Sequence, residues 1–208
     1  GTNGPIWEMT VRGNDLYAVG GFSRAGGGTA ERIAKWDGAA WSRINTGVPE
    51  SMVTSGPVLY AGFSGSGLYQ WDSTTWKRIS TNVPGSMITS GSVLYANFMG
   101  KGLYKWDGAT WTKLSGTVAE SMVASGSLLY VNWLGQGLYE YNGTTWTKLS
   151  GTVASSMAAS SSGLYVTWTG QGLYQWDGTA WSRITKTIPT SMVASGSLLY
   201  ANFTGDGI

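Results

Sequence analysis

The sequence contains neither cysteine nor histidine, and it carries few charges. Without cysteine it can form no disulfide and no thiolate metal site, and it has no cysteine nucleophile. Without histidine it lacks the commonest general base and transition-metal ligand. We therefore expect no metal site and no cofactor.

Two further absences concern partners. The chain has 13 Lys plus Arg against 11 Asp plus Glu, and these charges are scattered, whereas nucleic-acid binding needs a clustered basic surface. No apolar run approaches the roughly 20 residues of a membrane helix. No secretory leader is recognisable at Gly1, as in a cytoplasmic protein, a mature secreted form or a fragment. We expect neither a nucleic-acid nor a membrane partner.

Apolar and aromatic residues are abundant instead. Hydrophobic residues make up 42% of the 208 residues and tryptophan alone occurs 12 times, which is too apolar for a disordered chain. A chain of this length fits one all-β domain, and we expect residues 1–208 to form a single domain.

The same unit recurs along the chain with a period of 35 residues. Two sets of residues carry the period: Met52, Met87, Met122, Met157 and Met192, and Tyr60, Tyr95, Tyr130, Tyr165 and Tyr200. Such a period is typical of a solenoid, a propeller or an array.

Each unit reads as four short strands. In residues 121–149 the expected strands cover residues 121–125, 128–133, 138–141 and 145–149, separated by Gly-Ser, Gly-x-Gly and Asn-Gly-Thr-Thr turns. We name these strands A to D. An isolated four-stranded sheet cannot bury both faces, so neighbouring units must stack face to face. The sequence therefore predicts an all-β fold, a β-propeller of four-stranded antiparallel blades.

The expected repeats cover residues 6–50, 51–85, 86–120, 121–155 and 156–190, followed by a half repeat at 191–208. The first repeat carries eight extra residues between strands B and C. The half repeat supplies strands A and B and stops at Asp206-Gly207-Ile208, where strand C should begin. Five full blades and a half blade favour a six-bladed ring over a five-bladed one. Either count leaves unpaired strand edges, which indicates either self-association through the incomplete last blade or a truncated chain.

The first repeat resembles the kelch-type repeats of surface propellers. The residues that carry the resemblance are Leu16-Tyr17, Gly21-Phe22 and residues 32–38 (Arg-Ile-Ala-Lys-Trp-Asp-Gly). The shorter units, with Gly-Leu-Tyr-Gln-Trp-Asp and a following Trp, resemble propeller repeats of bacterial secreted proteins. These resemblances imply an extracellular or cell-surface protein that serves in adhesion, sugar binding or scaffolding. The short units lack the kelch double glycine, so kelch functions do not carry over to them.

Positions that stay constant between repeats are those that the blade needs. The Leu-Tyr pairs and the Trp of strand D belong to this group, and we interpret them as packing residues. The Asp of Trp-Asp-Gly, such as Asp107, recurs in most repeats, and a ring of such carboxylates resembles a set of metal ligands. Because Asn142 replaces it in one repeat, we interpret it as a turn residue.

Positions that vary between repeats lie in the D–A and B–C loops, which open on one face of a propeller. There the sequence combines aromatic, small and neutral hydrogen-bonding side chains, which suits a hydroxyl-rich ligand such as a sugar. The alternative is that the aromatic residues only plug the blade ends. The candidate ligand-binding residues are Glu50, Phe63, Asn97, Phe98, Lys101, Glu120, Asn132, Trp133, Gln136, Trp168, Gln171, Asn202 and Phe203.

These observations favour two functions equally. One is a multivalent, lectin-like carbohydrate-binding propeller with repeated sites on the B–C/D–A face. The other is a non-catalytic structural or protein-interaction propeller, so the expected partners are glycans or a protein surface. Catalysis is not expected, because no nucleophile–base set can be assembled; Glu120 and Glu140 are the carboxylates to test.

Overall fold

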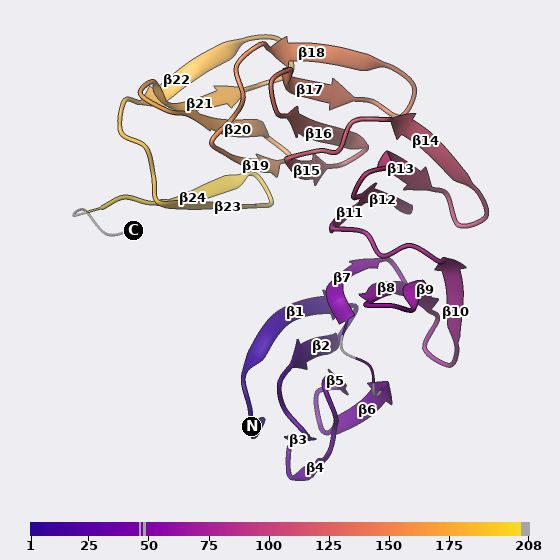
Figure 1. Ribbon diagram of the computed structural model, residues 1–208. Helices are drawn as coiled ribbons and strands as arrows, with labels where there is room; N and C mark the ends of the chain where they lie inside the picture. Colours follow the sequence, from indigo (N-terminus) through magenta and orange to yellow (C-terminus); the bar gives the residue numbers. More distant parts are fainter. Residues whose placement is uncertain (46, 48, 205–208) are drawn as a thin grey trace. The chain divides into compact units, whose positions relative to one another are not determined.

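The computed structural model describes residues 1–45, 47 and 49–204, and all regular structure in them is β. These residues form five four-stranded antiparallel sheets, one two-stranded sheet and one short hairpin. Each large sheet is a meander of strands that are consecutive along the chain, apart from the first, where the short hairpin intervenes (Figure 1). This confirms the expected all-β, β-propeller class with five full blades and a half blade.

The strands fall into the four expected positions. The A strands are β1 (Ile6–Arg12), β7 (Pro49–Ser55), β11 (Ser86–Ser90), β15 (Ser121–Ser125), β19 (Ser156–Ser160) and β23 (Ser191–Ser195). The B strands are β2 (Asp15–Gly20), β8 (Val58–Phe63), β12 (Val93–Phe98), β16 (Leu128–Trp133), β20 (Gly163–Trp168) and β24 (Leu198–Asn202). The C strands are β5 (Ile33–Trp36), β9 (Gly67–Trp71), β13 (Gly102–Trp106), β17 (Gly137–Tyr141) and β21 (Gly172–Trp176). The D strands are β6 (Trp41–Asn45), β10 (Trp76–Ser80), β14 (Trp111–Ser115), β18 (Trp146–Ser150) and β22 (Trp181–Thr185).

Glycine is required where strand C begins. Gly137 has a φ of 97°, a backbone conformation that residues with a Cβ rarely adopt. A Cβ at this position would also collide with the carbonyl oxygen of Ser150 on the neighbouring strand. The same glycine opens β9, β13 and β21, so the Gly-x-Gly turn is a backbone requirement of the blade.

The chain divides into two compact units, Gly1–Gly116 and Thr117–Ile208. Unit 1 holds the three sheets made from β1 to β14, and unit 2 holds the two sheets of β15 to β22 together with the hairpin β23–β24. The prediction of a single domain over residues 1–208 stays a prediction.

Sheets within a unit pack face to face through apolar side chains. In unit 1, Tyr17 and Ile33 of the first sheet pack against Leu59 and Phe63 of the second. In unit 2, Tyr130 packs in one cluster with Leu164, Val166 and Trp168 of the following sheet. The constant Leu-Tyr residues therefore form the cores between blades, as their repetition predicted.

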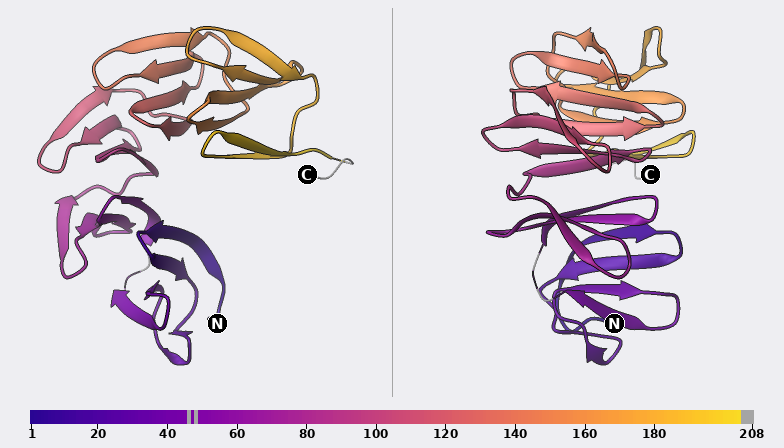
Figure 2. Two further views of the ribbon diagram at one scale, coloured as in Figure 1. Left: turned by 180° about the vertical axis from the view of Figure 1, so that it is seen from behind. Right: turned by 90° about the vertical axis from the view of Figure 1, so that its right-hand side faces the viewer.

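The extra residues of the first repeat lie between strands B and C, as expected. They form the short hairpin of β3 (Arg24–Ala25) and β4 (Gly28–Thr29), which projects beyond the first sheet (Figure 1; Figure 2, left). Phe22, Ala25 and Ala30 pack on Ala18 and Ala34 of that sheet. The insertion therefore covers part of a blade face with its own apolar side chains.

The hairpin β23–β24 is the last regular element in the described part of unit 2, and Val193 pairs with Tyr200 in it. The expected start of a further strand at Asp206 lies outside the described residues, and the blade number of the ring stays a prediction.

Candidate functional site

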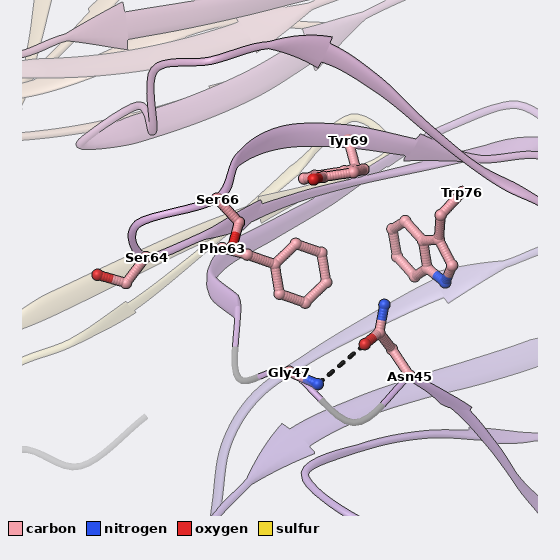
Figure 3. A pocket seen from close by; sticks show the side chains of 7 residues that line it. All are labelled: Asn45, Gly47, Phe63, Ser64, Ser66, Tyr69 and Trp76. Atoms are coloured by element: carbon pink, nitrogen blue, oxygen red, sulfur yellow. Dashed lines mark hydrogen bonds between the residues drawn. The ribbon is translucent and has the colours of Figure 1, made fainter.

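A pocket of about 330 Å³ opens in unit 1 beside the B–C loop of the second sheet. Three aromatic rings line it: Phe63 at the end of β8, Tyr69 on β9 and Trp76 at the start of β10 (Figure 3). Polar and small residues complete it, namely Asn45 at the end of β6, Gly47 in the D–A connection, and Ser64 and Ser66 in the B–C loop. The pocket thus lies among the loops that the sequence singled out.

The three rings hold one another in place. Phe63 meets Tyr69 and Trp76 edge-on, with ring centroids 5.7 and 5.4 Å apart. The Trp76 indole Nε1 donates a hydrogen bond of 3.1 Å to the carbonyl oxygen of Ile44, which fixes the indole against the preceding sheet. Phe63 is buried, whereas Tyr69 and Trp76 are half-buried. The pocket therefore offers two partly accessible aromatic rings on a rigid base.

The polar side of the pocket is neutral. Asn45 Oδ1 accepts a hydrogen bond of 2.9 Å from the backbone N–H of Gly47, which shapes the connection that leaves β6 (Figure 3). The backbone N–H of Ser66 donates to the carbonyl oxygen of Phe63, closing the B–C turn. Both serine residues are exposed, and no lining residue carries a charge.

Of the candidate residues, the aromatic ones at the end of strand B are largely internal. Phe63, Phe98, Trp133 and Trp168 retain between 5 and 7% of their exposure. Each contacts the Tyr of strand C in its own sheet, as Trp133 contacts Tyr139 with ring centroids 5.1 Å apart. These rings plug the blade ends, and of the four only Phe63 also lines the pocket. Phe203, in the last hairpin, is half-buried.

The amide candidates differ from one repeat to the next. Asn97 and Asn132 are buried, whereas Asn202 is exposed. Asn97 Nδ2 donates to Ser86 Oγ at 3.3 Å. Asn132 exchanges two hydrogen bonds with the backbone of Ala154, and its Nδ2 also lies 3.5 Å from Glu120 Oε2. The structure thus brings Glu120 and Asn132 together, with Asn132 serving mainly to join neighbouring sheets.

The loop candidates are exposed. Lys101 and Gln136 reach across to the D–A connections, where they contact Asn82 and Thr117. Gln171 is exposed at the same loop position of the next repeat. These side chains are the ones that a ligand on this face would meet first.

Glu50 lies at a second hollow of about 520 Å³ in unit 1, which Trp7 and Glu8 also line. Burial raises the pKa of Glu8, although a hydrogen bond of 3.0 Å from the backbone N–H of Met52 partly offsets this effect. The Trp7 side chain is 61% exposed. Sequence comparison could have found Glu8, because Ser occupies its position in every other repeat.

The Asp of Trp-Asp-Gly is a turn residue, as interpreted. Asp107 Oδ1 accepts hydrogen bonds of 2.8 Å from the backbone N–H groups of Ala109 and Thr110, and Asn142 accepts the equivalent pair. These bonds hold the pKa of Asp107 low, at about 2. Across the described residues, no group of three or more acidic side chains could hold a metal ion.

Glu140, one of the two carboxylates selected as catalytic candidates, faces Tyr130. Burial of the phenol, together with the charge of Glu140 and a hydrogen bond to it, raises the pKa of Tyr130. Glu140 thus has a packing partner in its own sheet. Glu120, the other carboxylate, lies beside Asn132.

Four pocket residues escaped the sequence analysis: Asn45, Gly47, Tyr69 and Trp76. Tyr69 and Trp76 belong to the constant set and were assigned to packing alone. Gly47 was detectable, because the corresponding positions in the other repeats carry Asn or Thr.

No family model and no curated protein matches this sequence. Solved structures do match in fold. YCF48 bound to D1 peptide aligns with a TM-score of 0.63 and 14% identity over 91% of this chain and 72% of that one. The GH74 xyloglucanase from Xanthomonas campestris aligns with a TM-score of 0.63 and 14% identity over 93% of this chain and 34% of that one. The ectodomain of the Physcomitrella patens receptor kinase CR4 aligns with a TM-score of 0.67 and 12% identity over 99% of this chain and 60% of that one.

These likenesses establish the fold alone, because every identity lies below 25%. The chain is a repeat protein built from propeller blades, and it spans only part of the length of each matched chain. No helix in the described part of the chain is long and apolar enough to cross a membrane.

Proposed function

We propose that this protein is a lectin-like module that binds a neutral, hydroxyl-rich ligand, such as a pyranose, in the pocket at Phe63. The observation that carries the proposal is the joint presence there of half-buried Tyr69 and Trp76 rings and of uncharged hydrogen-bonding groups. A sugar presents an apolar C–H face to an aromatic ring and hydroxyls to amide and serine side chains. The volume of about 330 Å³ is at the lower end of the usual range for small-ligand pockets.

The neutrality of the pocket argues for the chemical class. A phosphate or carboxylate ligand would need a cation or a cluster of N–H donors to replace its hydration. A cationic ligand would need a carboxylate or a fully exposed indole face. The seven lining residues supply neither kind of charge. A neutral polyol avoids this desolvation penalty.

The setting and the absence of catalysis stay part of the proposal. A non-catalytic module on a cell surface or in the extracellular space fits a chain without a nucleophile–base set. The resemblance to kelch-like and bacterial secreted propeller repeats supports the same setting.

Calorimetric titration with methyl glycosides of glucose, galactose, mannose and N-acetylglucosamine tests the proposal. We expect at least one to bind at millimolar or lower concentration. Asn45→Ala should then weaken binding about 10-fold, the loss of roughly one good hydrogen bond.

A matched control is available in the next repeat. Ser80 Oγ accepts a hydrogen bond from the backbone N–H of Asn82, just as Asn45 Oδ1 does from Gly47. Ser80→Ala should therefore leave the affinity unchanged. If the folded protein binds none of the four glycosides at a concentration of about 10 mM, the pocket is not a sugar site.

Protein interaction is the second candidate function. Trp7, Met9 and Val11 of β1 are exposed together, which is unusual for large apolar side chains. The matched structures include YCF48 with a bound peptide and a mitotic checkpoint complex, so propellers of this fold serve as interaction modules. Self-association through the hairpin β23–β24 belongs to this candidate.

A further inference from the structure

The site at Phe63 has structural counterparts in the following repeats, but side chains bridge those counterparts. In the third sheet, Lys101 Nζ in the B–C loop donates a hydrogen bond of 2.7 Å to Asn82 Oδ1 in the D–A connection. In unit 2, Gln136 Nε2 reaches Thr117 Oγ1 at 3.4 Å in the same way. Each bridging residue also donates its backbone N–H to the carbonyl oxygen of the residue that ends strand B, Phe98 or Trp133.

In the second sheet neither end of this bridge exists. The loop position holds Ser66, whose side chain is too short to reach across, and the connection position holds Gly47. The corresponding connection residues in the other repeats are Asn82, Thr117, Thr152 and Thr187. The pocket opens where both the bridging side chain and its partner are missing.

Gly47 also lies too close to Phe63 for a larger residue. A Cβ added at Gly47 would meet Phe63 Cδ1 at 2.9 Å, closer than real Cβ atoms approach other atoms, and Cε1 at 3.1 Å, which is an unusually tight contact. Because Phe63 is packed against Tyr69 and Trp76, a larger residue at position 47 would crowd a ring that lines the pocket. Glycine at this position therefore keeps the pocket open.

We infer that residues 47 and 66 determine which repeat binds ligand, so that the second repeat carries an open site and the third and fourth carry the same site closed by their own side chains. This inference rests on the proposed function. It changes the expected valence: the third and fourth repeats lose their sites, whereas sequence repetition alone predicts several equivalent sites.

Stoichiometry tests the inference, with the methyl glycoside that binds most tightly in the panel as the probe. Gly47→Thr should bind one equivalent fewer than the wild type, because it closes the site of the second repeat. The double variant Asn82→Gly/Lys101→Ser should bind one equivalent more than the wild type, because it removes the bridge of the third sheet. A double variant with the wild-type stoichiometry would overturn the inference while leaving the proposed function intact.

A second measurement works without any sugar. The chain has no cysteine, so a single thiol can be placed at Tyr69 or at its counterpart Tyr104. Alkylation by iodoacetamide should be several-fold faster for Tyr69→Cys than for Tyr104→Cys, because Tyr69 lines the open pocket, whereas the Lys101–Asn82 bridge joins loop and connection in the sheet of Tyr104. Adding Lys101→Ser should raise the slower rate toward the faster one. Equal rates in the two single variants contradict the inference even if no glycoside binds.

Discussion

Asn132 and Ala154 exchange two hydrogen bonds between neighbouring sheets. Asn132 Nδ2 donates to the carbonyl oxygen of Ala154 and Asn132 Oδ1 accepts from its backbone N–H, both at 3.0 Å. Both residues are buried, with Asn132 wholly inaccessible to solvent. The Asn132 amide therefore provides hydrogen-bond partners for the backbone N–H and C=O of Ala154, which lies in the connection to the next sheet.

This exchange predicts a large loss of stability for Asn132→Ala. The variant leaves the N–H and C=O of Ala154 buried without partners, and each such group costs about 1–3 kcal/mol. We expect the free energy of unfolding to fall by about 3 kcal/mol in urea titrations. Asn202→Ala is the matched control, because Asn202 has the same place in β24 but is exposed, and it should change stability by less than about 0.5 kcal/mol. Equal effects of the two variants would show that the exchange contributes little.

Asn132 also shows where sequence reasoning reached its limit. The 35-residue period, the four strands of residues 121–149 and the insertion in the first repeat followed from pattern alone, because turn glycines and alternating apolar residues act locally. Asn132 was assigned to ligand binding because its position varies between repeats. The contact that explains it spans 22 residues to a neighbouring sheet, and no local pattern encodes that contact. Gly47 differs from its counterparts in the other repeats, so comparison of the repeats could detect it, but its contact with the ring of Phe63 shows only in the structure.

The Asp turns predict acid sensitivity. Backbone N–H groups of Thr110 and Ala109 lower the pKa of Asp107 from 3.8 to about 2. An acid with a lowered pKa in the folded state stabilises the fold above its unfolded pKa, and this contribution disappears as the pH falls through the folded pKa. Stability should therefore decline between about pH 4 and pH 2. Asp107→Asn should keep the turn, as Asn142 does, and should lessen that decline.

Acid titrations followed by tryptophan fluorescence measure this effect, and NMR of the Asp107 carboxyl checks its pKa directly. A carboxyl that titrates near 3.8, or an Asp107→Asn variant with an unchanged acid limb, contradicts the prediction.

In the third sheet, the Trp of strand D links neighbouring sheets through its indole N–H. Trp111 Nε1 donates to the carbonyl oxygen of Ile79 at 2.9 Å. Trp111→Phe removes this bond and some apolar contact, whereas Trp41→Phe removes similar contact only, since Trp41 makes no such bond among the described residues. We expect Trp111→Phe to destabilise unit 1 by about 1 kcal/mol more than Trp41→Phe, the usual value of one hydrogen bond. Chemical unfolding of the two variants measures the difference, and equal losses would assign the role of Trp111 to packing alone.

The hairpin β23–β24 presents an apolar face that is packed in other repeats. Val193 is 62% exposed and Tyr200 49%, whereas their counterparts Val53 and Tyr60 pack against Leu94 of the next sheet. Because the equivalent face packs against a neighbouring sheet in other repeats, its exposure here favours association with another apolar face. Sedimentation velocity should therefore show a concentration-dependent shift from monomer to larger species. Replacing Val193 and Tyr200 with Thr and Ser should weaken association about 10-fold or more, because each buried apolar side chain contributes about 1.5–3 kcal/mol. The same replacements should leave sugar binding in unit 1 unchanged, and a strictly monomeric wild type at high concentration contradicts the prediction.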